Sequence, residues 1–310
     1  MIRRIISTLT IRFTSDNMKK KKVNVEVPRK GVKSAGEIIK FPNKSVLHVN
    51  KGTFKNRVLV GTPTTGLVRV EWMMARYGNI IPTNWSHSDN VQFMSSYVPL
   101  TFQVPDAENL IAKYFVENDF EWLLFIESDN VIPQDTFKLM NEYMLDMDYP
   151  VVSGLYFTKS DPPEPMIYRS QGWGYFNDWK MGDKVMASGV PFGCCLIHGS
   201  LIRELWKISP EYNVGGTNTR RVFNNPSDIW YDPETRGWMK ISGTSDLQFC
   251  DKLKKEGILE KAGWSAFQKK EYPYLVDTSI YVKHIDQQGN QWPMAIPEKF
   301  LPYRAGKTIE

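Results

Sequence analysis

Short apolar runs alternate along the chain with amphipathic segments, a pattern typical of a sheet with crossover helices. Residues 58–62 and 122–126 are apolar runs of strand length, and each is followed by a segment with the 3.6-residue period of a helix. Residues 66–77 are expected to form the first helix. Its predicted apolar face carries Leu67, Val70, Met73 and Met74. Strand, tight turn and helix in this order is the opening unit of a nucleotide-binding α/β sheet.

The same alternation continues through most of the chain. Further helices are predicted to begin at Pro105, which suits a first helical turn, and over 133–147, 200–206 and 245–256. Further strands are predicted over 149–153, 192–198 and 277–282. Segments 78–104 and 209–243 are expected to be irregular, and about a dozen residues near 261–272 are expected to form a further loop before the last predicted strand. We therefore predict a parallel or mixed α/β sheet without internal repeats.

Composition bounds the class of protein. A chain of 310 residues with 42% apolar residues can bury the core of one large α/β domain or two small ones. Its three cysteines form neither a disulfide framework nor a zinc spacing, which favours a reducing, cytoplasmic setting. No run of about 18 apolar residues predicts a membrane span. The first residues lack a secretory cleavage site, and Met18 is an alternative start.

Charge is distributed unevenly along the chain. Residues 1–57 hold 15 Lys and Arg against 3 Asp and Glu, a net charge of +12, so the remainder carries −7 of the total of +5. Such a basic arm can contact nucleic acid or an anionic membrane, or it can be a solvated extension with one short strand at 23–27. Both interpretations stay open.

The most informative chemistry follows the strand at 122–126. Glu127 and Asp129 stand two residues apart, and in an extended chain such residues point to the same side. Carboxylate oxygens that converge at the carboxyl end of a strand suit a hard cation such as Mg²⁺ or Mn²⁺. The alternative is that these acids face solvent or cap a helix.

Two later residues add candidate chemistry. His284 directly follows the last predicted strand, and neutral imidazole is a suitable third ligand for Mn²⁺, although a lone histidine is more often structural. Asp246 lies in the first turn of the helix at 245–256, where the helix dipole alone favours an acid. If this turn faces a substrate, Asp246 can instead act as a base towards a hydroxyl, with Thr244 or Ser245 as the helix cap.

Four segments, taken in order, carry a family resemblance. Residues 124–129 (LFIESD) match a metal-binding acidic triplet, and residues 149–157 (YPVVSGLYF) match the strand and glycine-aromatic turn that follow it. Residues 190–197 (VPFGCCLI) are similar to an acceptor-side strand, and residues 243–250 (GTSDLQFC) to a helix start with an acidic pair. Over about residues 58–290 the chain thus resembles the GT-A type glycosyltransferases, particularly family 2 and its relatives.

This resemblance implies a fold and a division of the chain. The fold is a Rossmann-like mixed sheet with helices on both faces, in which nucleotide-binding and acceptor-binding halves are fused. Residues 1–57 would form the basic arm, 58–290 the transferase domain and 291–310 a C-terminal tail. Within the domain, 58–157 would bind the nucleotide-sugar and 158–290 the acceptor.

The resemblance also implies roles for single residues. Asp246 would be the catalytic base, and Glu127, Asp129 and His284 the ligands of Mn²⁺ or Mg²⁺. Residues at the nucleotide-sugar would be Thr62, Pro63, Thr64, Arg69, Glu127, Ser128 and Asp129. Residues at the acceptor would be Tyr156, Gly193, Trp238 and Ser245.

The chain departs from the family pattern at three positions. Glu127 replaces the usual first aspartate, and Ser245 replaces the usual glutamate beside Asp246. Glu108 stands in the sequence Ala-Glu-Asn where many relatives have Ala-Arg-Asn, so no diphosphate-binding role transfers to it. Arg69, early in the first helix, could supply the missing positive charge.

The implied activity is transfer of a sugar from a nucleoside-diphosphate sugar to an acceptor hydroxyl. Two alternative functions stay open. One is a nucleotidyltransferase, although residues 61–66 lack the basic glycine-rich loop of that class. The other is a non-catalytic carbohydrate- or nucleic-acid-binding protein on the same fold. The sequence leaves the acceptor open between a saccharide, a protein and a modified nucleic-acid base. The donor sugar, the inverting or retaining stereochemistry and the oligomeric state are open as well.

The predicted loops also carry aromatic residues. These residues suit stacking on sugars or bases, or packing beneath the loops. They are Trp173, Tyr175, Trp179, Trp230, Tyr231 and Trp238.

Overall fold

The computed structural model describes residues 56–82, 85, 94–169, 174–301 and 307–310. Contacts divide the chain into Met1–Glu37 and Ile38–Glu310, and every described residue belongs to the second unit. The basic arm, the strand at 23–27 and Trp173 therefore lie outside the described residues, except for residues 56 and 57 at the end of the arm. Within the described ranges, no helix is both long enough and apolar enough to cross a bilayer.

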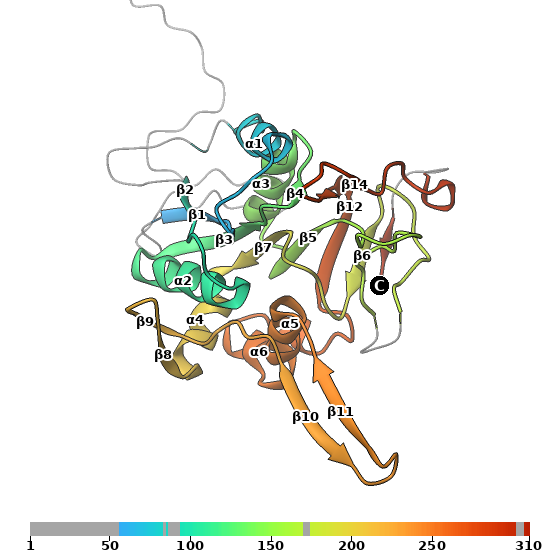
Figure 1. The fold of residues 1–310 in the computed structure, drawn as a ribbon. Helices are drawn as coiled ribbons and strands as arrows, with labels where there is room; N and C mark the ends of the chain where they lie inside the picture. Colours follow the sequence, from blue (N-terminus) through green and yellow to red (C-terminus); the bar gives the residue numbers. More distant parts are fainter. Residues whose placement is uncertain (1–55, 83–84, 86–93, 170–173, 302–306) are drawn as a thin grey trace, which may run out of the picture. The chain divides into compact units, whose positions relative to one another are not determined.

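An eight-stranded mixed sheet forms the centre of the fold, in the order β15-β6-β12-β5-β7-β3-β1-β2 (Figure 1). Strands β1, β2 and β3 are parallel, whereas β7 runs antiparallel between β3 and β5. This is the Rossmann-like mixed α/β sheet that the sequence predicts. The strands are β1 (Asn56–Gly61), β2 (Met94–Tyr97), β3 (Phe120–Ile126), β5 (Val151–Leu155), β6 (Lys184–Ala187), β7 (Cys194–His198), β12 (Tyr274–Tyr281) and β15 (Thr308–Ile309).

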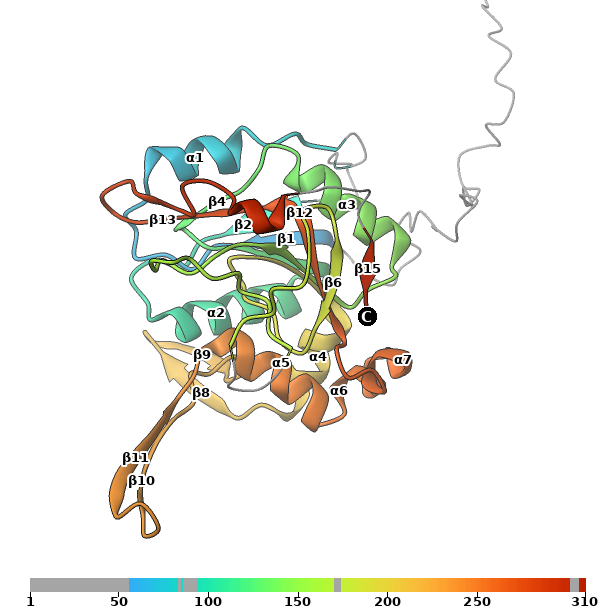
Figure 2. The same ribbon diagram turned by 90° about the vertical axis from the view of Figure 1, so that its right-hand side faces the viewer.

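Helices cover both faces of this sheet, as Figure 2 shows. One face carries α1 (Val70–Tyr77) and α3 (Thr136–Asp146). The other carries α2 (Val104–Glu117), α4 (Gly199–Ile208), α5 (Ser245–Lys255), α6 (Ile258–Lys261) and α7 (Ser265–Gln268). The predicted arrangement with helices on both faces is confirmed.

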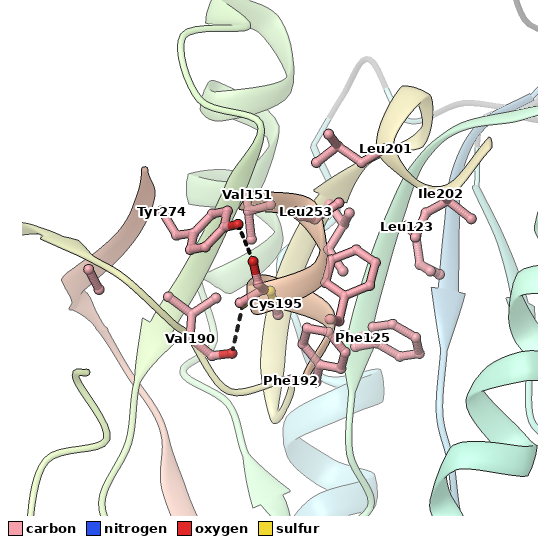
Figure 3. Packing of buried hydrophobic residues seen from close by; sticks show 14 of the residues in the cluster. Leu123, Phe125, Val151, Val190, Phe192, Cys195, Leu201, Ile202, Leu253 and Tyr274 are labelled. Carbon is pink, nitrogen blue, oxygen red and sulfur yellow. Dashed lines mark hydrogen bonds between the residues drawn. The ribbon is translucent and has the colours of Figure 1, made fainter. Parts of the chain in front are cut away.

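The core has two layers because side chains of a strand alternate between faces. In β3, Leu123 and Phe125 belong to the cluster under α2, α4 and α5, while Trp122 and Leu124 belong to the cluster under α1 and α3. Figure 3 shows part of the first cluster, where the Tyr274 hydroxyl donates a 2.6 Å hydrogen bond to a main-chain carbonyl of α5. Each of these strands has both of its faces buried, which explains why the corresponding segments are continuous apolar runs.

The first helix differs from its prediction. It begins at Val70 rather than at residue 66, and the four residues of the predicted apolar face are all exposed. Trp72 and Arg76 are buried instead. They stand four residues apart and so share one side of the helix, where Arg76 lies over the Phe137 ring and donates to the Ser96 hydroxyl. A partnered guanidinium, rather than an aliphatic stripe, thus faces the protein.

Segments predicted as irregular contain regular structure. β2 lies within 78–104, and α7 within 261–272. Residues 209–243 fold into two antiparallel hairpins, β8 (Glu211–Val214) with β9 (Thr217–Arg220) and β10 (Ser227–Asp232) with β11 (Gly237–Ser242). Both views show the β10–β11 hairpin projecting away from the sheet (Figures 1 and 2). Strands β8 and β9 are mostly polar, whereas β10 and β11 carry exposed apolar side chains such as Ile229, Trp230 and Trp238. Neither hairpin therefore shows the alternation of a strand with one buried face.

The C-terminal part of the chain adds to both sheets. A small sheet joins β14 (Gln291–Trp292), β13 (Lys283–Ile285) and β4 (Asn130–Val131), in that order. The short 3₁₀ helix η1 (Glu298–Phe300) follows, and Phe300 stacks on Trp179 with the ring centroids 4.0 Å apart. β15 then pairs with β6 at the edge of the main sheet.

Candidate active site

The main chain that follows β3 is held by the residue before β7 and by a side chain of α1. The Glu127 amide donates to the Gly193 carbonyl over 3.1 Å, and the Glu127 carbonyl accepts a 2.8 Å bond from the Trp72 indole. The Asn130 amide also donates to the Glu127 carbonyl, which closes a tight turn. Because β3 and β1 are parallel, this turn lies at the carboxyl edge of the sheet, where ligands of open α/β folds bind.

Asn130 orients the two predicted carboxylates. Its side-chain amide nitrogen donates to Asp129 Oδ1 over 2.8 Å and to Glu127 Oε2 over 3.3 Å. Asn130 is fully buried, and its amide oxygen has no hydrogen-bond partner among the described residues. Two acids and an unpaired carbonyl oxygen therefore gather at one turn, with Ser128 half-buried between the acids.

The small sheet brings His284 to this turn. His284 is directly opposite Asn130 in the pairing of β13 with β4, and the next residue donates its amide to the Asp129 carbonyl. Its Nδ1 hydrogen-bonds the Phe157 carbonyl over 2.5 Å. A carbonyl only accepts, so Nδ1 carries the proton and Nε2 keeps its lone pair. Burial lowers the pKa of His284 against the opposing effect of Asp129, which favours the neutral imidazole.

Asp129 has a cationic partner. Lys159, in the loop after β5, forms an ion pair with Asp129 Oδ2, and both side chains are partly exposed. The other oxygen, Oδ1, accepts the bond from Asn130. Both oxygens of this carboxylate are therefore engaged within the protein.

Glu127, Asp129 and His284 stay the predicted ligands of a divalent cation. In the part of the chain that the structure describes, no three His, Cys, Asp or Glu side chains are grouped as a metal site. Mg²⁺ typically takes only one or two protein carboxylates and completes its shell with water and substrate phosphates. Glu127, Asp129 and the free Nε2 of His284 offer such a partial set, and the Nδ1 bond to a backbone carbonyl is the usual support of a ligating histidine.

Asp246 faces the same region from α5. Burial raises the pKa of Asp246, although Asp246 Oδ1 accepts bonds from the Leu247 amide and from the Thr244 hydroxyl. The charge of Asp246 in turn raises the pKa of Glu127, after burial and Asp129, so the acids are neighbours. Thr244 occupies the N-cap position, as expected, but its hydroxyl donates to Asp246 and makes no capping bond to the helix.

A third element contributes an acid that sequence reasoning set aside. Glu108 of α2 is only 1% exposed, accepts a hydrogen bond from the Ser245 hydroxyl, and has an Oε2 atom without a partner among the described residues. Burial, followed by the charges of Glu127 and Asp246, holds the pKa of Glu108 well above its usual range. The helical period indicates the burial of Glu108, because this residue shares one helix face with the buried residues Ile111, Ala112 and Phe115.

Tyr156 and Gly193 form the floor between these acids. The Gly193 amide donates to the Tyr156 hydroxyl over 2.8 Å, and the Tyr156 ring meets His284 edge-on at 4.8 Å. Burial raises the pKa of Tyr156, and the charges of Glu127 and Asp246 add to this. A Cβ atom on Gly193 would lie 2.6 Å from the Tyr156 ring and 2.7 Å from the Asn130 amide nitrogen. Only glycine permits this approach.

The residues predicted at the nucleotide lie at the carboxyl end of β1. Thr62 donates its amide to the Tyr97 carbonyl, and Thr62, Pro63 and Thr64 are all buried. Arg69 is the N-cap residue of α1, binds both carboxylate oxygens of Glu71, and donates to the Gln287 carbonyl. Its positive charge is thus already paired.

Trp238 is not brought to the acids. It is the second residue of β11, next to the hairpin turn and at the opposite end of that strand from α5. Its side chain is 74% exposed. The structure therefore gathers Tyr156, Gly193 and Ser245, but not Trp238, around Glu127 and Asp246.

No family model and no curated protein sequence matches the chain. Among solved structures, A197 from STIV matches at 13% identity with a TM-score of 0.44, over 75% of this chain and 87% of the other. S. aureus TarS 1–349 in complex with UDP-GlcNAc matches at 14% identity and 0.30, over 50% of this chain and 48% of that one. A Bacillus anthracis protein assigned as a glucose-1-phosphate thymidylyltransferase matches at 10% identity with a TM-score of 0.28, over 50% of this chain and 76% of the other. Similarities of this size identify neither a family nor an activity.

Proposed function

We propose that the chain is a metal-dependent glycosyltransferase that moves a sugar from a nucleoside-diphosphate sugar to an acceptor hydroxyl. The observation that carries the proposal is the convergence of Glu127, Asp129, His284 and Asp246, from separate elements, at the carboxyl edge of β3. Two carboxylates and a neutral imidazole suit Mn²⁺ or Mg²⁺, and the diphosphate would complete the coordination. The three buried, unbridged cysteines fit a cytoplasmic setting.

Each residue has a defined task in this proposal. Glu127, Asp129 and His284 would hold the cation, whose chemistry would be to stabilise negative charge on the departing diphosphate. Asp246 accepts the proton of the acceptor hydroxyl as the hydroxyl oxygen bonds to the anomeric carbon and the bond from that carbon to the diphosphate breaks. A raised pKa of Asp246 suits such a base, because a stronger base removes the proton more readily near neutral pH. This displacement inverts the configuration at the anomeric carbon.

Position supports the donor assignment as well. Thr62, Pro63 and Thr64 end β1 at the same sheet edge as Glu127, because β1 and β3 are parallel neighbours. A nucleotide held at this edge would extend its diphosphate towards the acids. Arg69, which is already paired with Glu71, supports this assignment less than the strand ends do.

A panel of nucleoside-diphosphate sugars with Mn²⁺, scored by release of the nucleoside diphosphate, tests the proposal. We expect at least one donor to be turned over, Asp129→Asn to reduce its turnover by at least about tenfold, and EDTA to stop it. The matched control is Asp232→Asn, whose carboxylate serves only the turn of the β10–β11 hairpin. Full turnover by Asp129→Asn, or no binding of any donor, would contradict the proposal.

A further inference from the structure

A second polar pocket lies at the N-terminal end of α2. It is partly open, has a volume of about 210 Å³, and is lined by the start of α2, by Tyr212 of β8 and by Arg221, Phe223, Asn224 and Asn225. None of the residues assigned above to the donor, the metal or the base lines it. A pocket of this size is smaller than the roughly 300–1,000 Å³ of sites for drug-sized molecules, so it accommodates a single ring.

One wall of this pocket is fixed by a closed hydrogen-bond network. The Asn109 amide nitrogen donates to the Tyr212 hydroxyl over 3.0 Å and to the Phe223 carbonyl over 2.9 Å, while its oxygen accepts from the Phe223 amide over 2.9 Å. The Tyr212 hydroxyl in turn donates to Asp106 over 2.8 Å. Asn109 is buried, so the wall is rigid before any ligand arrives.

The remaining polar side chains of the lining keep their hydrogen-bonding groups available. Gln103, Arg221, Asn224 and Asn225 make no side-chain hydrogen bond or ion pair within the described part of the chain. Amides both donate and accept, and a guanidinium donates, which together match the mixed donor and acceptor character of sugar hydroxyls. Asp106 and Arg221 carry the only formal charges of the lining, and they are opposite. This balance disfavours a phosphate.

The pocket adjoins the acid cluster formed by Glu108, Glu127, Asp129 and Asp246. Asn109 in its wall directly follows Glu108, which receives the Ser245 hydroxyl bond. The Phe223 ring, whose main chain is held by Asn109, stacks on Phe249 of α5 with centroids 5.1 Å apart. The pocket thus shares α2 with Glu108, and Phe223 in its lining packs on α5, the helix that carries Asp246.

We propose that this pocket is a saccharide subsite, which holds one sugar ring of the acceptor beside the ring that reacts. The inference rests on the proposed glycosyltransferase function and extends it, because it selects a saccharide among the acceptors that the sequence leaves open. The hydrogen-bonded wall of Asn109 and Tyr212 fixes the shape of the pocket, and the unpaired side chains of the lining supply hydrogen bonds to the ring.

Saturation-transfer NMR on the full-length chain tests this assignment. The probes are the methyl glycosides of glucose, galactose, mannose and N-acetylglucosamine. We expect at least one glycoside to bind and Arg221→Ala or Asn225→Ala to weaken it about tenfold, as loss of a hydrogen bond to a charged or preorganised group does. Both residues are exposed, so neither substitution disturbs the core.

Arg236→Ala, an exposed arginine in the turn of the β10–β11 hairpin, is the matched control and should bind like the parent protein. Binding of no glycoside, or glycoside binding by both pocket variants that is as tight as binding by the parent protein, would overturn the proposal. Release of nucleoside diphosphate without acceptor is measured in parallel. Normal release with failed glycoside binding rejects the subsite alone, whereas glycoside binding without any release rejects the transferase function.

Discussion

Lys159 forms an ion pair with the carboxylate of Asp129, and we propose Asp129 as a ligand of the cation. Its ammonium group is paired with Oδ2, and the two side chains are 34% and 42% exposed. Both remain accessible to solvent, so the pair can separate without unfolding the loop that carries Lys159. A divalent cation bound to Asp129 has to compete with this amine.

The first prediction follows from that competition. Lys159→Ala should increase the affinity for Mn²⁺, measured by isothermal titration calorimetry in the absence of any nucleotide. Partly exposed ion pairs contribute about 0.2–1 kcal/mol, so the dissociation constant should fall by at most about fivefold. Lys270→Ala is the control, because Lys270 is similarly exposed and paired with Glu310 at the C-terminus. Weaker binding by Lys159→Ala would show that the lysine does not compete with the cation.

A second prediction concerns stability as a function of pH. Burial, together with Asp129 and Asp246, raises the pKa of Glu127 to about 8. Between the unfolded pKa near 4.5 and this value, the folded protein keeps a proton that the unfolded chain has lost. The metal-free protein should therefore be most stable below pH 5 with respect to this group, and should lose that contribution as the pH rises to 8.

Thermal unfolding in EDTA at pH 5, 6, 7 and 8 measures this effect. Glu127→Gln removes the titrating group, so its midpoint should fall less than that of the parent protein over the same range. Glu234→Gln, an exposed acid in the hairpin turn, should keep the parent slope. Identical slopes for Glu127→Gln and the parent protein would contradict the raised pKa.

Glu108 allows a prediction in which stability and activity change in opposite directions. Its carboxyl group is buried beside Glu127 and Asp246, with one oxygen unpaired. Glu108→Gln keeps the size but removes the charge that burial penalises, and should stabilise the fold at pH 8 by about 1 kcal/mol. The substitution also alters the acceptor of the Ser245 hydroxyl beside Asp246, so release of nucleoside diphosphate should slow.

Chemical denaturation at pH 8 and the release assay test both halves of this prediction. The control is Glu142→Gln, an exposed acid on α3. Lower stability of Glu108→Gln would mean that the carboxylate itself supports the fold. Unchanged turnover would mean that Ser245 and Asp246 do not depend on it.

The elements that the sequence predicts well are those buried by the central sheet. β3, α2 and α5 carry their apolar residues with the period of a strand or helix, and that pattern fixes both their type and their buried side. The predicted buried face of α1 is wrong because the side that is buried holds Arg76. The burial of Arg76 depends on partners distant in the sequence, such as Ser96 and Phe137. Such partners cannot be read from a local pattern.

The candidate site shows the same division. Glu127 and Asp129 are recognisable because their spacing and their place after a strand are local features. That His284 pairs with Asn130 follows only from the register of β13 against β4. Glu108 went unassigned because its charge departs from the family pattern, while its position on the buried face of α2 was the more informative property.

Gly193 gives a prediction about the floor of the site. A methyl group there would lie 2.6–2.7 Å from Tyr156 and Asn130, both of which are buried. Gly193→Ala should destabilise the protein by about 1–3 kcal/mol, the usual cost of overpacking, and should reduce donor turnover by displacing the turn that holds Glu127. Gly237→Ala is the control, because the nearest atom to its Cβ would be 3.8 Å away. Denaturation curves of Gly193→Ala that match those of the parent would show that the floor can yield.

Trp238 allows a test of whether the β10–β11 hairpin takes part in the reaction. Its predicted contact with the acceptor stays a prediction, but its side chain stands beside the hairpin turn, at the end of β11 that is remote from Asp246. Trp238→Ala should therefore leave acceptor-independent release of nucleoside diphosphate within about twofold of the parent rate, whereas Asp129→Asn should abolish most of it. Because the side chain is 74% exposed, the free energy of unfolding should change by less than about 0.5 kcal/mol. If Trp238→Ala lost turnover as Asp129→Asn does, the hairpin would have to fold back over the acids during the reaction, and the division between a fixed site and a projecting ribbon would be wrong.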